Sequence, residues 1–153
     1  MTDVTKFIDK ETGEIHIGEV VIGPDTKWED IERLAPYAEV SGNERVTCLG
    51  FKTRLTAENI PVRVELTLFA EDDDSMITLM CEPPEEYDAP KEWNYIWLEA
   101  GKVWLKAVLG EPDWESECSI RYKYSWGMIS IFVSRDKRGD LSGGEIFVRY
   151  EKN

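Results

Sequence analysis

The strictest pattern in the chain is the alternation of apolar and polar residues in the segment IPVRVELTLFA, residues 60–70. Successive side chains of a β-strand point to opposite faces, so this alternation predicts a strand with one apolar face. The residues on that face are Val62, Val64, Leu66 and Leu68. Such a face must be covered, and the segment therefore predicts a sheet with other elements packed on one side of it.

Comparable strand patterns lie on both sides of this segment. ERVTCLGFKTRL (44–55) precedes it after a polar turn at 56–59, and SMITLMCE (75–82) follows the acidic turn at 71–74. We expect these three segments to form consecutive antiparallel strands. Three further strand runs close the chain, namely CSIRYKYS, GMISIFVS and GEIFVRY.

The clearest helical pattern lies between Pro90 and Gly110. Apolar residues recur there at steps of three and four, Pro90 suits the first turn, and Gly110 suits the end of a helix. Gly101 in its middle costs about 1 kcal/mol relative to alanine, which indicates a close approach to a neighbouring element.

The N-terminal region predicts a hairpin followed by a short helix. Residues 3–22 place β-branched residues around the turn sequence KETG, with Gly18 bending the second arm. Thr26 directly precedes the segment KWEDIERLAPY (27–37) and fits a capping box with Glu29, and the helix is expected to end at Pro36.

This order of elements predicts a single α+β domain over residues 1–153, an antiparallel sheet with two helices packed on one face. After the hairpin, the order helix–strand–strand–strand occurs twice, over 24–82 and 90–151, as two αβββ units. At an offset of 76 residues Trp28 aligns with Trp104, which is compatible with an internal duplication. A continuous sheet without duplication predicts the same class, and both interpretations stay open.

The charge of the chain indicates which classes of partner it can attract. The chain has 31 acidic and 18 basic residues and a net charge of -13, which disfavours nucleic acid and anionic membranes and favours a basic partner. The N-terminus lacks the basic start and apolar run of a secretory signal, and no run reaches the ~18–20 apolar residues of a membrane span. We therefore expect a cytoplasmic protein.

Residues suited to catalysis or metal binding are sparse. His16 is the only histidine, and Cys48, Cys81 and Cys118 are far apart, without the close pairs of a zinc site. Nucleophile, phosphate-loop and dinucleotide motifs are missing from the sequence. We expect reduced cysteines at buried or strand positions, no cofactor or metal, and a protein that is not an enzyme.

The negative charge is concentrated in one stretch. Residues 71–117 contain 14 acids and 3 bases, whereas residues 118–153 contain 7 bases and 4 acids. If the acidic segments meet in space, they form an acidic face with aromatic side chains, which suits a basic protein partner. The predicted partner-binding residues are Asp72, Asp73, Asp74, Glu85, Glu86, Tyr87, Trp93 and Trp114.

Two alternatives to this binding protein stay open. The first is a small-molecule-binding or enzymatic domain with a pocket between helix and sheet. Its lining would be Trp97, Trp104, Tyr122, Tyr124 and Trp126, of which Trp97 and Trp104 also suit the core-facing side of the helix. The second is a homo-oligomer that pairs through an exposed strand edge.

The C-terminal third also resembles known proteins. WL at 104–105, LGEP at 109–112, the strand pair YKYSWGMISI and the closing EIFVRY are similar to a pattern in small bacterial proteins of the toxin-immunity kind. More distantly, the segment resembles the helix-and-strand units of the β-lactamase inhibitor protein and of the outer-membrane assembly lipoprotein. The resemblance covers about 50 residues and implies a non-catalytic α+β binding protein that inhibits a partner.

Overall fold

The computed structural model of the chain describes residues 8–57, 60–81 and 93–151. In this part of the chain nine strands form one sheet, and every pair of neighbours is antiparallel. The strand order is β3-β4-β6-β7-β11-β10-β9-β8, and β5 pairs with the first residues of β6. The strands are Ala38–Gly42 (β3), Val46–Phe51 (β4), Leu55–Ala57 (β5), Ile60–Phe69 (β6), Asp74–Cys81 (β7), Trp114–Ser116 (β8), Ser119–Tyr124 (β9), Gly127–Arg135 (β10) and Leu141–Tyr150 (β11).

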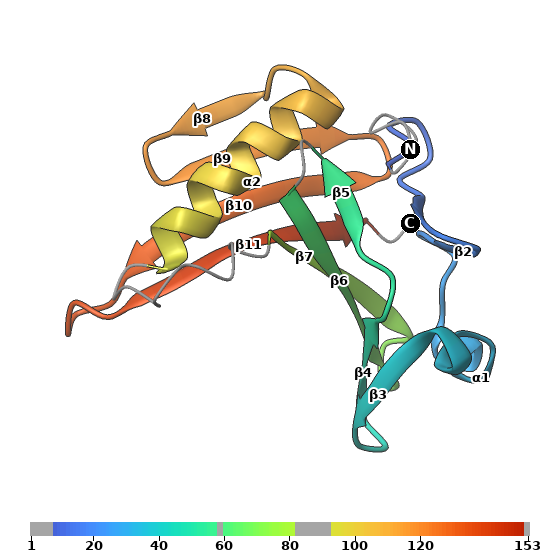
Figure 1. Cartoon of the computed structure of the whole chain (residues 1–153). Helices are drawn as coiled ribbons and strands as arrows, with labels where there is room; N and C mark the ends of the chain where they lie inside the picture. Colours follow the sequence, from blue (N-terminus) through green and yellow to red (C-terminus); the bar gives the residue numbers. More distant parts are fainter. Residues whose placement is uncertain (1–7, 58–59, 82–92, 152–153) are drawn as a thin grey trace.

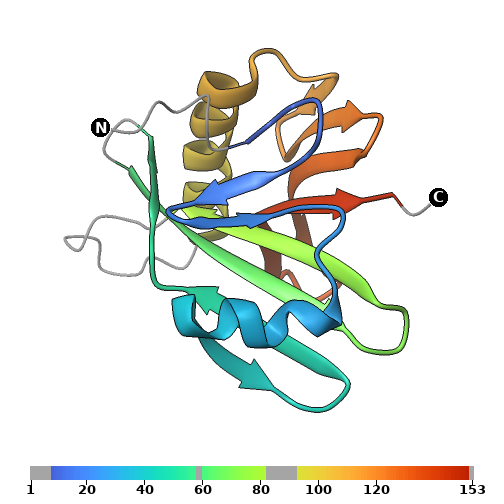
Figure 2. The ribbon, with the colours of Figure 1, turned by 90° about the vertical axis from the view of Figure 1, so that its right-hand side faces the viewer.

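The remaining elements pack on this sheet as an α+β fold. Helix α2 (Trp93–Leu109) lies on β7, β10 and β11 (Figure 1). Helix α1 is one turn, Ile31–Leu34, extended at both ends by 3₁₀ turns. The hairpin of β1 (Ile15–Ile17) and β2 (Val20–Ile22) forms a separate two-stranded sheet, seen in the foreground of Figure 2. Among the described residues, no helix has the length and apolar character needed to cross a membrane.

The buried side of the sheet is continuous from β4 to β9. Strand pairing places one row of residues side by side across six strands, and each of them is at most 2% exposed. That row is Leu49, Leu66, Ile77, Val148, Ile129 and Tyr122. The predicted apolar face of β6 belongs to it, since Val62, Val64, Leu66 and Leu68 are all fully buried. Four buried side chains of the β1–β2 hairpin and Leu34 of α1 join the same core.

The opposite side of the sheet, here called the outer face, carries the alternating residues. Most of its side chains are half-buried or exposed, and Phe132 and Trp114 are 44% and 49% exposed. One row across it is Gly50, Glu65, Thr78, Phe147, Ser130, Arg121 and Trp114. The next row is Cys48, Thr67, Met76, Arg149, Met128 and Lys123.

Helix α2 agrees with its sequence pattern at both of its predicted glycines. The backbone of Gly110 has a φ of +86°, and its N–H donates to the carbonyl oxygen of Lys106, so the helix ends there. A Cβ atom at Gly101 would lie 2.5 Å from Cδ1 of Ile131. The close approach that Gly101 indicated is therefore a contact with strand β10.

Three local expectations need correction. The hairpin turns at Gly18 itself, because Ile17 pairs with Val20, while the KETG turn only brings Ile8 opposite Ile15. The capping box at Thr26 and Glu29 is also wrong: the Thr26 hydroxyl accepts the N–H of Gly23, and the helical segment starts after Lys27, whose N–H donates to Asp30. In addition, Cys118 is exposed in the turn between β8 and β9 rather than buried or in a strand.

The sheet consists of two four-stranded meanders that meet at their last strands. The first runs β3-β4-β6-β7 after α1, the second runs β8-β9-β10-β11 after α2, and β7 pairs with β11. The second unit has one more strand than predicted, the edge strand β8. The first unit has two more, the edge strand β3 and the short strand β5, which occupies part of the turn predicted at 56–59. A duplication would produce this arrangement, and it stays a prediction.

Candidate functional site

Three adjoining hollows lie near the end of the sheet where β11 finishes. The first, the loop hollow, has a volume of about 260 Å³ and is lined mainly by residues between β2 and α1. The second, the acidic hollow, measures about 490 Å³ and shares Pro24 and Asp25 with the first. The third, the basic hollow, measures about 530 Å³ and shares Tyr150 and Glu151 with the second. The three together form one run of concave surface.

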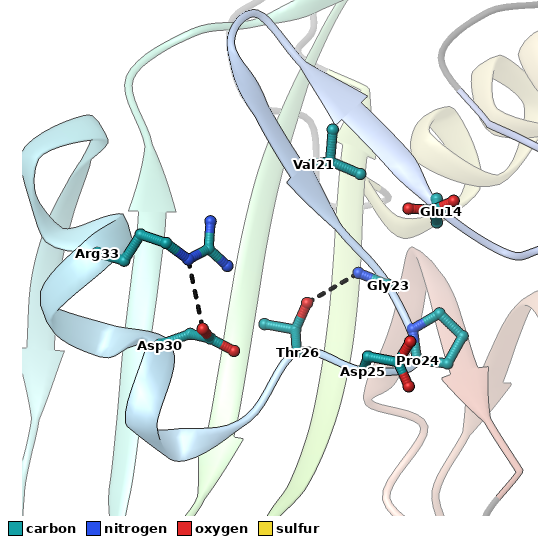
Figure 3. Close-up of a pocket in the computed structure, with 8 residues that line it drawn as sticks. All are labelled: Glu14, Val21, Gly23, Pro24, Asp25, Thr26, Asp30 and Arg33. Atoms are coloured by element: carbon teal, nitrogen blue, oxygen red, sulfur yellow. Dashed lines mark hydrogen bonds and ion pairs between the residues drawn. The ribbon is translucent and has the colours of Figure 1, made fainter.

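The loop hollow is built around a tight turn. The N–H of Gly23 donates to the Thr26 hydroxyl at 2.9 Å, and the N–H of Thr26 donates back to the Gly23 carbonyl oxygen at 3.0 Å. This pair holds Pro24 and Asp25 at the tip. Figure 3 shows the Asp30–Arg33 ion pair, 3.3 Å long, on one side of the turn, with Glu14 and Asp25 on the other.

The acidic hollow surrounds the turn between β6 and β7. Asp73 has a φ of +49°, and its carboxylate accepts the backbone N–H of Trp28 at 3.1 Å, which ties the turn to the first helical segment. Asp74 accepts the N–H of Ser75 at 2.9 Å. The charged residues that line this hollow are five carboxylates and one base, namely Asp25, Asp72, Asp73, Asp74, Glu151 and Lys27.

The predicted partner-binding residues do not all share one surface. Asp72, Asp73 and Asp74 lie together in the acidic hollow, whereas Trp114 lines the basic hollow. The two groups adjoin only through Tyr150 and Glu151. Glu85, Glu86 and Tyr87 lie outside the described residues, and Trp93 is the first residue of α2.

The acidic residues next to Trp114 in the sequence, Asp113 and Glu115, suggested acidic surroundings, but the structure shows otherwise. The guanidinium carbon of Arg121 lies 4.9 Å from the centre of its ring, a cation–π contact. Glu115, the next residue, reaches away to helix α2, where its carboxylate lies 2.9 Å from Lys106 Nζ and 3.6 Å from Lys102 Nζ. Asp113 uses its carboxylate to accept the backbone N–H of Lys123 at 2.7 Å. Trp114 therefore faces a cation.

The aromatic residues of the small-molecule alternative are engaged in packing. Trp104 is 1% exposed, and the buried hydroxyl of Tyr122 donates to the carbonyl oxygen of Gly110 at 2.6 Å. Tyr124 stacks on Trp126 with ring centres 5.0 Å apart, and the indole N–H of Trp126 donates to the carbonyl oxygen of Lys10. Trp97 is half-buried. None of these five side chains lines the three hollows, and the small-molecule alternative stays a prediction.

The cysteine and histidine side chains, which could act as nucleophiles or metal ligands, do not line the three hollows. Burial raises the pKa of the Cys81 thiol to about 12, so this thiol stays protonated at neutral pH. His16 is exposed on β1, and Cys48 lies on the outer face within 3.7 Å of the Thr67 hydroxyl. Within the described part of the chain, no group of three or more His, Cys, Asp or Glu side chains is placed to hold a metal ion.

Several residues of the hollows were not predicted from the sequence. The acidic hollow adds Asp25 and Glu151 to the predicted aspartates, and the basic hollow brings together Arg121, Lys123 and Arg149. The signal for the basic group was the excess of bases after residue 117. Charge counts do not say which of these bases share a face of the sheet.

Comparison of this chain with protein-family models, with curated proteins and with solved structures found no match.

Proposed function

We propose that this protein is a non-catalytic binding protein whose acidic hollow receives a basic segment of a partner protein. The observation that carries the proposal is the lining of that hollow, in which five carboxylates face one base, Lys27. The two aspartates whose hydrogen bonds hold the turn, Asp73 and Asp74, keep the hollow in shape without any ligand. A preorganised concave surface of one sign attracts and orients a partner of the opposite sign.

The kind of partner is proposed from the resemblance of residues 104–150 to immunity proteins. An immunity or inhibitor protein binds a toxin or enzyme and blocks it, which needs surface complementarity and no catalytic residues. The loop hollow extends the negative surface, because Glu14 and Asp25 lie on the side of the 23–26 turn away from Arg33 (Figure 3). A partner loop rich in lysine and arginine fits this surface.

The test compares two variants that have the same net charge. D25N/D72N/D74N removes three carboxylates from the acidic hollow and leaves Asp73 in place. At position 74 the asparagine keeps an oxygen that can accept the N–H of Ser75, so the hydrogen bonds that hold the turn are retained. E19Q/E32Q/E44Q removes three exposed carboxylates outside the hollows. Each immobilised variant is exposed to lysate of the source cells, and the captured proteins are eluted with rising salt.

The expected result is a basic protein that the wild type and E19Q/E32Q/E44Q capture equally, that D25N/D72N/D74N does not retain, and that salt releases. Equal capture by both variants, or binding indifferent to salt, contradicts the proposal. A toxin encoded beside the gene of this chain supports the immunity role, and purified toxin then provides an inhibition assay.

A further inference from the structure

The basic hollow is unusual for this chain because three cations converge on it in a protein of net charge -13. Strand pairing explains the convergence. Met128 of β10 lies between Lys123 of β9 and Arg149 of β11 on the outer face, and Arg121 is two residues before Lys123 on the same side of β9. Cross-strand neighbours have Cβ atoms about 5 Å apart. The three cationic side chains therefore rise around one thioether.

These cations are not neutralised by ion pairs within the described residues. The described ion pairs involve Arg33, Lys102 and Lys106, and none involves Arg121, Lys123 or Arg149. Two carboxylates also line the hollow: Asp113, which accepts the backbone N–H of Lys123, and Glu151. Three bases against two acids leave an excess of positive charge in the hollow.

The aromatic side of the hollow is equally specific. Trp114 is 49% exposed, its ring is held by Arg121, and Tyr150 lines the same hollow near the end of β11. Exposed indole rings beside fixed cations favour flat ligands that carry negative charge, since one end of the ligand stacks and the other is neutralised. A volume of about 530 Å³ falls within the range of small-molecule sites.

We propose that the basic hollow binds a small anionic ligand with a planar ring, the ring packing on Trp114 and Met128 and the phosphate or carboxylate lying between Lys123, Arg121 and Arg149. The three cations attract an anionic ligand and repel a basic peptide segment, so charge complementarity favours the anionic ligand as the occupant. The proposal does not rest on the partner proposed for the acidic hollow, because its binding groups line the basic hollow alone; they are Trp114, Arg121, Lys123 and Arg149.

The test uses adenosine monophosphate as the planar anion, with adenosine and inorganic phosphate as probes that each keep one half of it. Binding to the full chain is measured by calorimetry, and the indole signal of Trp114 is followed by nuclear magnetic resonance. We expect adenosine monophosphate to bind at least about tenfold more tightly than either half and to shift the Trp114 signal. Failure to bind at millimolar concentration, or no shift at Trp114, overturns the proposal.

Variants locate the site. Arg149→Gln and Trp114→Ala should each weaken binding of adenosine monophosphate about tenfold. Arg149→Gln should do so with unchanged thermal unfolding, because its side chain is exposed. Arg138→Gln removes one exposed arginine from the turn between β10 and β11, and should leave the affinity unchanged. Equal effects of R149Q and R138Q overturn the proposal. A wild type that dimerises in solution and becomes monomeric in R149Q also overturns it, because the hollow then receives a second copy of this chain.

Discussion

The phenol of Tyr150 donates a hydrogen bond of 2.7 Å to the carbonyl oxygen of Gly13, 137 residues earlier in the chain. This bond ties the end of β11 to the N-terminal turn. Tyr150→Phe removes the donor and leaves a carbonyl oxygen unpaired, so we expect the free energy of unfolding at pH 7 to fall by about 1 kcal/mol. Urea denaturation measures the difference.

The surroundings of the Tyr150 phenol also lead us to expect that its contribution to stability changes at high pH. Burial, together with nearby Glu14, raises the pKa of Tyr150 above its ordinary value. Above about pH 10 the unfolded chain releases this proton while the folded chain keeps it, so rising pH favours unfolding of the wild type. Tyr150→Phe lacks this response, and its deficit should shrink and then reverse. A deficit that stays constant between pH 7 and pH 11 contradicts the assignment.

At Gly101, packing and helix propensity should have opposite effects on the stability of an alanine variant. Alanine stabilises a helix interior by about 1 kcal/mol relative to glycine, but a Cβ here meets Cδ1 of the fully buried Ile131 at 2.5 Å. We expect Gly101→Ala to destabilise the protein by about 1–2 kcal/mol. Ile131→Val removes that methyl group, and in this background Gly101→Ala should no longer destabilise. Additive effects in thermal or urea unfolding would show that the contact is not responsible.

Lys102 should contribute more to the stability of the protein than Lys106, one turn later on the same helix. The ammonium group of Lys102, a residue 9% exposed, donates to the carbonyl oxygens of Ser116 at 2.9 Å and Glu117 at 3.3 Å. Lys102→Met keeps the apolar stem but leaves both acceptors without this donor, at a cost of about 1–2 kcal/mol. Lys106→Met removes only an exposed ion pair with Glu115, and we expect no measurable change. Similar losses in the two variants would contradict this assignment.

The three thiols should react in order of exposure, and the raised pKa of Cys81 should slow that thiol further. Cys118 is exposed, Cys48 is half-buried and Cys81 is buried. With a pKa of about 12, Cys81 is ionised in about one molecule in ten thousand at pH 8. A colorimetric disulfide reagent should label Cys118 first and Cys81 only in denaturant. Cys118→Ser should abolish the fast phase, and a fast phase that persists would refute the order.

Local patterns determined which segments became regular structure. The alternation around Val64 and the stop at Gly110 each depend on a few residues in sequence, because the period of a strand or helix decides directly which side chains reach the core. The α+β class followed from the order of these segments. The edge strands β3 and β8 were not predicted, because segments of five and three residues with mostly exposed side chains show little periodicity.

The hollows were decided by tertiary structure alone. Arg149 lies across Met128 from Lys123 because β11 pairs with β10, and Asp25 shares a hollow with Asp72 although 46 residues separate them. The sequence by itself determined the periodicities, the buried face of each main strand and the negative charge of the chain. Which acids and which bases gather at one end of the sheet depends on strand order and register, and these are set by long-range pairing that no local pattern encodes.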